Sequence, residues 1–161
     1  MTKLVKLRNK DSGGKPIILN PNGAENLGVF LQLVNITQNV REDWDEGGRA
    51  YFPAMLRSTD VSHEFMVEGP IAEVGGVRRK SLNDMLELAK DRFKKSAAYV
   101  SSIPDLLRGY KTFSGMLLIS GREIVKVMEK EGAEAVFEGC ERSIRLSDQT
   151  LANISAFSQL V

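Results

Sequence analysis

The chain has 161 residues, of which 42% are hydrophobic and 27% charged, and its formal net charge is +1. This composition is typical of a globular protein with a core, and it excludes a disordered, fibrous or strongly polyelectrolyte chain. The single cysteine excludes an intramolecular disulfide framework. No apolar run approaches the roughly 20 residues that span a bilayer, and no signal-peptide block follows the basic N-terminus. We therefore expect an intracellular, cytoplasmic protein without a membrane partner.

The first half of the chain predicts β-structure. Side chains alternate between apolar and polar in KLVKLRN (3–9), and PIILN (16–20) follows after a glycine-rich turn, so these segments predict a hairpin. Further strands are expected at 28–40, 49–59 and 62–74, and the acidic stretch 41–48 is expected to be an exposed loop. Residues 1–75 are thus predicted to be mainly β, with the hairpin entering an antiparallel sheet.

The second half changes to helical periodicity. Apolar residues recur at spacings of three and four from Ser81 to Val100, which predicts an amphipathic helix. Thr112, Phe113 and the apolar run after them favour a strand at 110–120. Further helices are expected from about 121, with a bend at Gly132, and from about 148. No repeat or linker divides the chain, so we expect a single α+β domain over 1–161, with 81–161 mainly α.

No motif in the sequence indicates a reaction or a cofactor. The stretch SGGK (12–15) resembles a phosphate loop, but Pro16 and a strand follow it where a helix is required, so a hairpin turn is the better interpretation. The acidic residues of 42–46 lack the spacing of a calcium loop, so we expect no metal site. Cys140 and His63 are the two side chains most suited to catalysis, and nothing in the sequence brings them together.

Basic residues next to an aromatic ring suggest a nucleic-acid surface. Arg49, Tyr51 and Arg57 share one face of the strand expected at 49–59, where cations hold phosphates and a ring stacks on a base. An ordinary solvated strand face explains the same pattern. Gly75 and Gly76, followed by the basic run 78–80, suggest a flexible basic approach to the next helix. Alternating charged patches suit a homo-oligomer or a polyanion such as RNA.

Residues 7–29 resemble the N-terminal hairpin of coat proteins of small single-stranded RNA phages. The resemblance is carried by Leu7, Asn9, Gly14, Lys15, Leu19-Asn20-Pro21, Gly23 and Gly28-Val29. It implies a hairpin leading into an antiparallel sheet, two helices after the last strand, a dimer with interlocked helices, and a sheet that binds an RNA hairpin. The helix at 81–100 departs from that pattern.

These observations lead to three hypotheses. The first is a non-enzymatic, self-assembling structural protein, coat-like, with RNA on its sheet face and a place in a virion. The second is a small intracellular α+β binding or regulatory module for a protein or nucleic-acid partner. The third is an enzyme without a recognisable motif, for which Cys140 or His63 would have to lie in a cleft with acidic neighbours.

Overall fold

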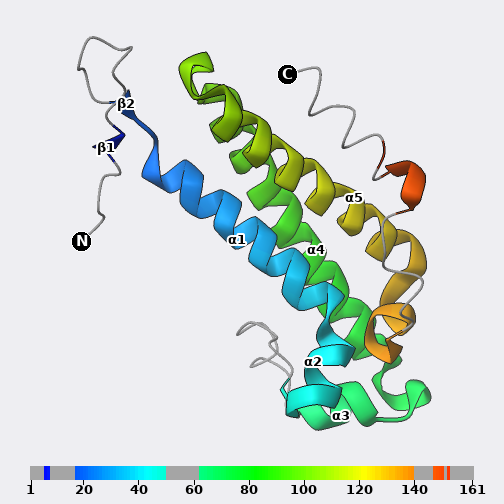
Figure 1. The fold of residues 1–161 in the computed structure, drawn as a ribbon. Coiled ribbons are helices and arrows are strands. Elements are labelled where there is room, and N and C mark those ends of the chain that lie inside the picture. The colour runs from blue at the N-terminus through cyan, green and yellow to red at the C-terminus, as the bar shows by residue number, and fades with distance from the viewer. Residues whose placement is uncertain (1–5, 8–16, 50–61, 140–146, 151, 153–161) are drawn as a thin grey trace.

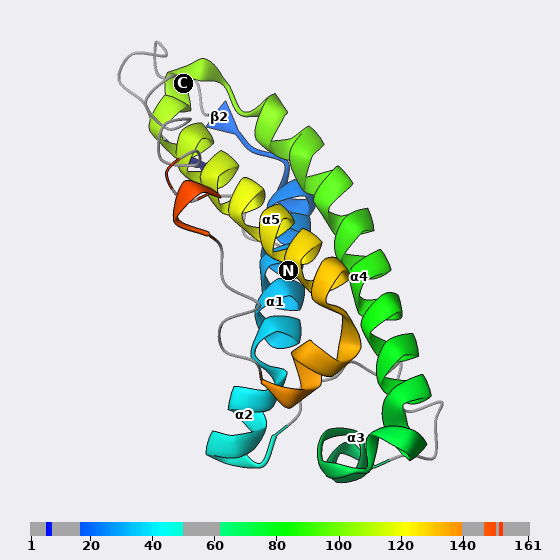
Figure 2. The ribbon, with the colours of Figure 1, turned by 90° about the vertical axis from the view of Figure 1, so that its right-hand side faces the viewer.

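The protein is described from a computed structural model, which covers residues 6–7, 17–49, 62–139, 147–150 and 152. In chain order the main elements are β1 (Lys6–Leu7), β2 (Ile17–Ile18), α1 (Pro21–Gln38), α2 (Val40–Gly47), α3 (His63–Glu68), α4 (Ile71–Ser102), the 3-10 helix η3 (Asp105–Leu107) and α5 (Arg108–Glu138). The three long helices α1, α4 and α5 lie side by side, and α2 and α3 gather at one end of them (Figures 1 and 2). The α+β prediction is therefore wrong, because the described residues form a helical bundle.

The strands amount to one short pair. β1 and β2 pair antiparallel, with Lys6 opposite Ile18 and Leu7 opposite Ile17, inside the two segments expected to form a hairpin. No sheet extends from this pair within the described ranges. The strands expected at 28–40, 62–74 and 110–120 are wrong, because these residues lie mainly in α1, in α3 with the start of α4, and in α5. The strand expected at 49–59 lies outside the described residues except for Arg49, and the single domain over 1–161 stays a prediction.

Helix α1 begins at a local capping signal. The side chain of Asn20 accepts hydrogen bonds from the backbone N–H groups of Asn22 and Gly23, and Pro21 occupies the first turn, where its missing N–H costs nothing. The β-branched and aromatic residues of 28–40 suggested a strand, but the buried positions of α1 recur at helical spacing. These buried residues are Gly23, Leu27, Phe30, Leu33, Val34 and Thr37.

Helices α4 and α5 carry the periodicity that the sequence showed. The helix expected at 81–100 is confirmed, although α4 begins ten residues earlier, at Ile71. The bend expected at Gly132 is also confirmed, since this residue has φ 81° and ψ −176° inside α5. A positive φ favours glycine because a Cβ would clash there. None of the helices in the described part of the chain has both the length and the apolarity to cross a membrane.

The bundle is close-packed where glycines face aromatic rings. A Cβ built on Gly121 of α5 would lie 2.6 Å from Cε1 of Phe30, and one built on Gly23 of α1 would lie 2.5 Å from Cδ2 of Tyr99. Phe30 also meets Phe93 of α4 edge to face, with ring centroids 5.7 Å apart. The absence of side chains at the two glycines therefore lets α1 approach both neighbouring helices.

We predict that Gly121→Ala lowers the free energy of unfolding by roughly 1–3 kcal/mol, because the added methyl group would displace the Phe30 ring. The matched control is Gly76→Ala, since Gly76 is exposed in α4 and a Cβ there would meet nothing within 4 Å. This control should raise the free energy of unfolding by roughly 0.5–1 kcal/mol through helix propensity alone. Urea unfolding measures both values, and equal effects would contradict the close approach.

The hydroxyl of Tyr99 is paired at the end of the bundle where α4 turns into α5. It lies 3.0 Å from the hydroxyl of Tyr110, and only 3% of Tyr99 is exposed. Burial, and after it the hydrogen bond to Tyr110, raises the pKa of Tyr99 well above its usual value. The folded state therefore holds this proton more tightly than the unfolded state does.

A raised folded-state pKa predicts a loss of stability in alkali. The contribution of Tyr99 should be complete below the unfolded tyrosine pKa of about 10 and should fall as the pH rises above it. Urea unfolding across this range should show the decline in the native sequence and a smaller one in Tyr99→Phe. Tyr110→Phe leaves Tyr99 buried and should keep most of the decline. An unchanged pH dependence in Tyr99→Phe would contradict the assignment.

Candidate functional site

One face of α1 is polar and unpacked. Glu25, Gly28, Gln32 and Asn35 follow one another at spacings of three and four, all are exposed, and Asn39 continues the line at the helix end. The side-chain amide of Asn39 donates a hydrogen bond to Oδ1 of Asn35 at 3.2 Å. We call these five residues the open face of α1. Its amide groups both donate and accept hydrogen bonds, so the face is suited to a polar ligand.

The open face leads into the acidic helix α2. Asn39 separates the two helices. Gly48 follows α2, has a φ of 60°, and donates its backbone N–H to the carbonyl oxygen of Trp44. The expected exposed loop at 41–48 is thus wrong, because acids in a first turn and a glycine after the last favour a helix. The carboxylates of α2 are Glu42, Asp43, Asp45 and Glu46.

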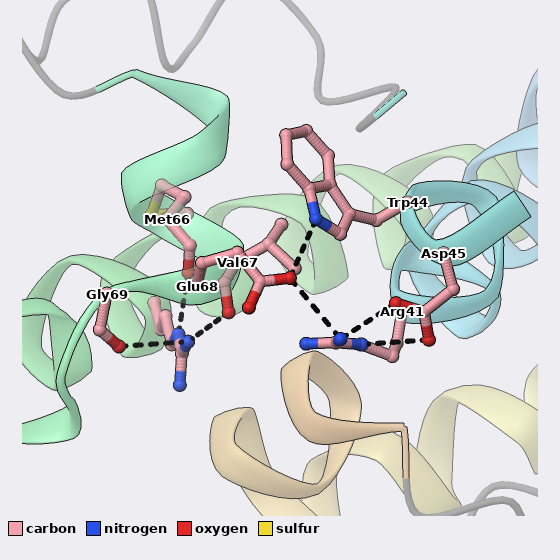
Figure 3. A network of polar contacts seen from close by, with 8 residues as sticks. Arg41, Trp44, Asp45, Met66, Val67, Glu68 and Gly69 are labelled. Carbon is pink, nitrogen blue, oxygen red and sulfur yellow. Dashed lines mark hydrogen bonds and ion pairs between the residues drawn. The ribbon is translucent and has the colours of Figure 1, made fainter. Parts of the chain in front are cut away.

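Polar contacts hold α2 against α3. The indole Nε1 of Trp44 donates to Oε1 of Glu68 at 2.8 Å, and Nη2 of Arg41 lies 3.3 Å from the same oxygen (Figure 3). Arg41 also binds Asp45 within α2, where Nε donates to Oδ2 at 3.0 Å and Nη2 lies 2.7 Å from Oδ1. The hydrogen bond to Asp45 raises the pKa of Arg41 above its usual value. Glu68 is thus the shared acceptor that joins the two short helices.

The predicted nucleic-acid residues are only partly described. Arg49 is exposed directly after α2, and its backbone N–H donates to the carbonyl oxygen of Asp43 at 3.4 Å. Tyr51 and Arg57 lie outside the described residues. A role of these three residues in binding nucleic acid stays a prediction.

Other residues singled out in the sequence fall in different places. The basic run 78–80 lies inside α4, where Arg78 is buried and Arg79 and Lys80 are exposed. The flexible basic approach expected there is therefore wrong. His63 is the exposed first residue of α3. Cys140 lies outside the described residues, so the described structure does not test whether the two side chains meet.

Carboxylate oxygens are the protein ligands that most often hold magnesium. The described residues contain no group of three or more His, Cys, Asp or Glu side chains placed to hold a metal ion. Both oxygens of Asp45 are engaged by Arg41. The residues described here therefore do not form a magnesium site by themselves.

A hollow lies between α4 and α5. Its volume is about 360 Å³, and Leu82, Leu86 and Ala133 contribute apolar lining. At its rim, Nζ of Lys90 lies 2.7 Å from Glu87 and 2.5 Å from Glu129. The hydrogen bond to Glu129, and after it the one to Glu87, raises the pKa of Lys90 above its usual value. Arg79 and Lys90 are the basic side chains that line this hollow. Because Lys90 is already paired with two carboxylates, the hollow is poorly suited to binding an anion.

Comparison with known proteins identifies the family. Residues 20–148 match the family model of squalene/phytoene synthase. A bifunctional lycopene cyclase/phytoene synthase of Colletotrichum graminicola is 30% identical over 124 residues, which cover 76% of this chain and 20% of that protein. No solved structure matches. The chain belongs to the squalene/phytoene synthase family, and it spans about a fifth of the length of the curated relative it matches.

Membership of this family contradicts the functional predictions made from the sequence. The resemblance to phage coat proteins is wrong, since its residues from Leu19 to Val29 lie almost entirely in the matched region and mostly form the start of α1. The structural coat-like function and the alternative of a small binding module are not supported. The prediction of a non-enzyme is also wrong, because members of this family are prenyltransferase-like enzymes of isoprenoid biosynthesis. The virion location has no support once the coat hypothesis is withdrawn.

The open face of α1 was missed because its segment was interpreted as a strand. Gln32 and Asn35 lie within the β-branched and aromatic run 28–40, which favours a strand. Counted instead from the helix start at Asn20-Pro21, the same residues fall on one line opposite the buried face. The helix-start signal was therefore the observation that would have revealed the face.

Proposed function

We propose that this chain takes part in a prenyltransferase-like synthase reaction, in which prenyl diphosphates are joined into a longer isoprenoid. The observation that carries the proposal is the match of 129 consecutive residues, 20–148, to the squalene/phytoene synthase family. The relative from Colletotrichum graminicola has phytoene synthase in its name, which supports the same class of reaction.

The geometry supports the open face of α1 as the substrate side. One side of α1 packs on α4 and α5, whereas the open face has exposed amides and is flanked by half-buried Val29 and Ile36. A prenyl diphosphate has an apolar tail and a polar head, so it matches a surface where both kinds of side chain are available. Gln32 and Asn35 are the side chains expected to donate hydrogen bonds to the ligand.

Charge sets the orientation of such a ligand. The carboxylates of α2 repel a bare diphosphate, so cations have to lie between these carboxylates and the diphosphate. Arg49 is the exposed cation that follows α2, and its planar guanidinium suits phosphate oxygens. We therefore expect the diphosphate near the junction of the open face with α2, with the prenyl tail directed along α1.

The test is binding and turnover of farnesyl diphosphate and geranylgeranyl diphosphate by the 161-residue chain in a buffer containing magnesium chloride. We expect binding by calorimetry, and products by gas chromatography with mass spectrometry. Asn35→Ala and Arg49→Ala should each weaken binding by roughly tenfold, because each removes a hydrogen bond to a charged group. Inorganic diphosphate and the free prenyl alcohols separate the contributions of head and tail.

The matched control is Asn83→Ala, which removes the same kind of side chain from the hollow between α4 and α5. It should bind the prenyl diphosphates as the native sequence does. The proposal fails if neither diphosphate binds nor reacts. The placement on α1 fails if Asn83→Ala loses as much affinity as Asn35→Ala.

A further inference from the structure

A buried arginine caps the short helix α3. Only 2% of Arg78 is exposed, and its guanidinium lies against the last carbonyl groups of α3. Nε donates to the carbonyl oxygen of Met66 at 2.7 Å, and Nη2 donates to those of Val67 at 2.6 Å and Gly69 at 3.5 Å. The last carbonyls of a helix have no partners within that helix, so Arg78 satisfies groups that would otherwise be left unpaired.

The same guanidinium also binds α5. Nη1 lies 3.4 Å from Oε2 of Glu134 and 4.0 Å from Oε1 of Glu138. The ring of Phe137 lies below it, with its centroid 5.5 Å from Cζ. One side chain of α4 therefore joins α3 and α5. A lysine has neither the planar fork nor enough directed donors for this set of contacts.

The chain of contacts continues from α3 to α2 through Glu68. This residue follows Val67 directly, and it accepts from Trp44 and pairs with Arg41, both in α2. The far side of Arg41 is confined by Gly139, the residue that follows α5, because a Cβ built there would lie 2.5 Å from Cγ of Arg41. α2 is thus held between Glu68 and the C-terminal end of α5.

We propose that Arg78 is a positioning residue that sets the orientation of α2 through α3 and Glu68. Arg78 touches neither the open face of α1 nor the carboxylates of α2, and it acts by fixing the backbone that carries Glu68. The orientation of α2 decides where its acids and Arg49 lie at the end of the open face. The consequence for ligand binding rests on the proposed function, whereas the coupling of Arg78 to α2 does not.

Trp44 makes the coupling measurable, since it is the only tryptophan in the chain and it bonds directly to Glu68. In Arg78→Met we expect greater quenching of Trp44 fluorescence by acrylamide and a shift of its emission to longer wavelength. Amide exchange in α2 should become roughly tenfold faster, because a charged hydrogen bond is lost from its support. Exchange in the centres of α1 and α4 should stay unchanged.

The matched control is Arg79→Met, which removes the neighbouring, exposed arginine and should leave Trp44 and α2 as they are. Glu68→Ala should reproduce the effect of Arg78→Met, and Glu68→Gln should restore part of it because an amide oxygen still accepts from Trp44. The double variant Arg78→Met/Glu68→Ala should change α2 exchange by less than the sum of the single changes.

Unchanged quenching and exchange in Arg78→Met would overturn the proposal, and so would an equal effect of Arg79→Met. If Arg78→Met does not fold, Glu68→Ala is measured in its place. Unchanged amide exchange of α2 in Glu68→Ala would also overturn the proposal. Titration of these variants with geranylgeranyl diphosphate then tests the consequence for function. Absence of binding by the native sequence contradicts the proposed function, whereas the fluorescence and exchange results still decide the role of Arg78.

Discussion

The guanidinium of Arg78 is the interaction on which the arrangement of the short helices depends. Burying a charge is costly unless carbonyls and carboxylates replace its water, and here three carbonyls of 66–69 and two carboxylates of α5 surround it. α3 has six residues and α2 has eight, lengths at which a helix is marginal by itself in water. Both short helices therefore owe their stability to contacts with the rest of the bundle. Arg78 supplies such contacts to α3, and α2 is held by Glu68 of α3 and by its own packing on α5.

The long helices provide the frame for this end of the molecule. Gly121 of α5 leaves room for the Phe30 ring of α1, and Gly23 lets α1 lie directly on the Tyr99 ring of α4. One face of α1 is therefore closed by α4 and α5. The opposite face keeps its amides free of packing, and it leads into the acidic helix α2. The candidate site thus lies where the long, well-packed helix α1 leads into the short helix α2, which is held by Glu68 of α3 and by the C-terminal end of α5.

Particular residues show why parts of the fold were predictable. The apolar spacing from Ser81 to Val100 predicted helix correctly because one side of α4 packs along much of its length. In 28–40, half-buried Val29 and Ile36 lie beside fully buried residues, and this hides the helical period behind a continuous apolar run. Asn20 falls at the end of the strand expected at 16–20, although Asn20-Pro21 is also the start signal of a helix.

Composition, periodicity and glycine conformation are local properties, so a globular chain, the amphipathic helix within α4 and the bend at Gly132 could be predicted from the amino-acid sequence. The burial of Arg78 next to the exposed Arg79, in contrast, follows from how the helices pack. The partners of Arg78 are Val67 and Met66, which lie 11 and 12 residues before it, and Glu134, which lies 56 residues after it. No local pattern encodes such partners, since the helices must first pack before an arginine in a basic run finds acceptors in place of water.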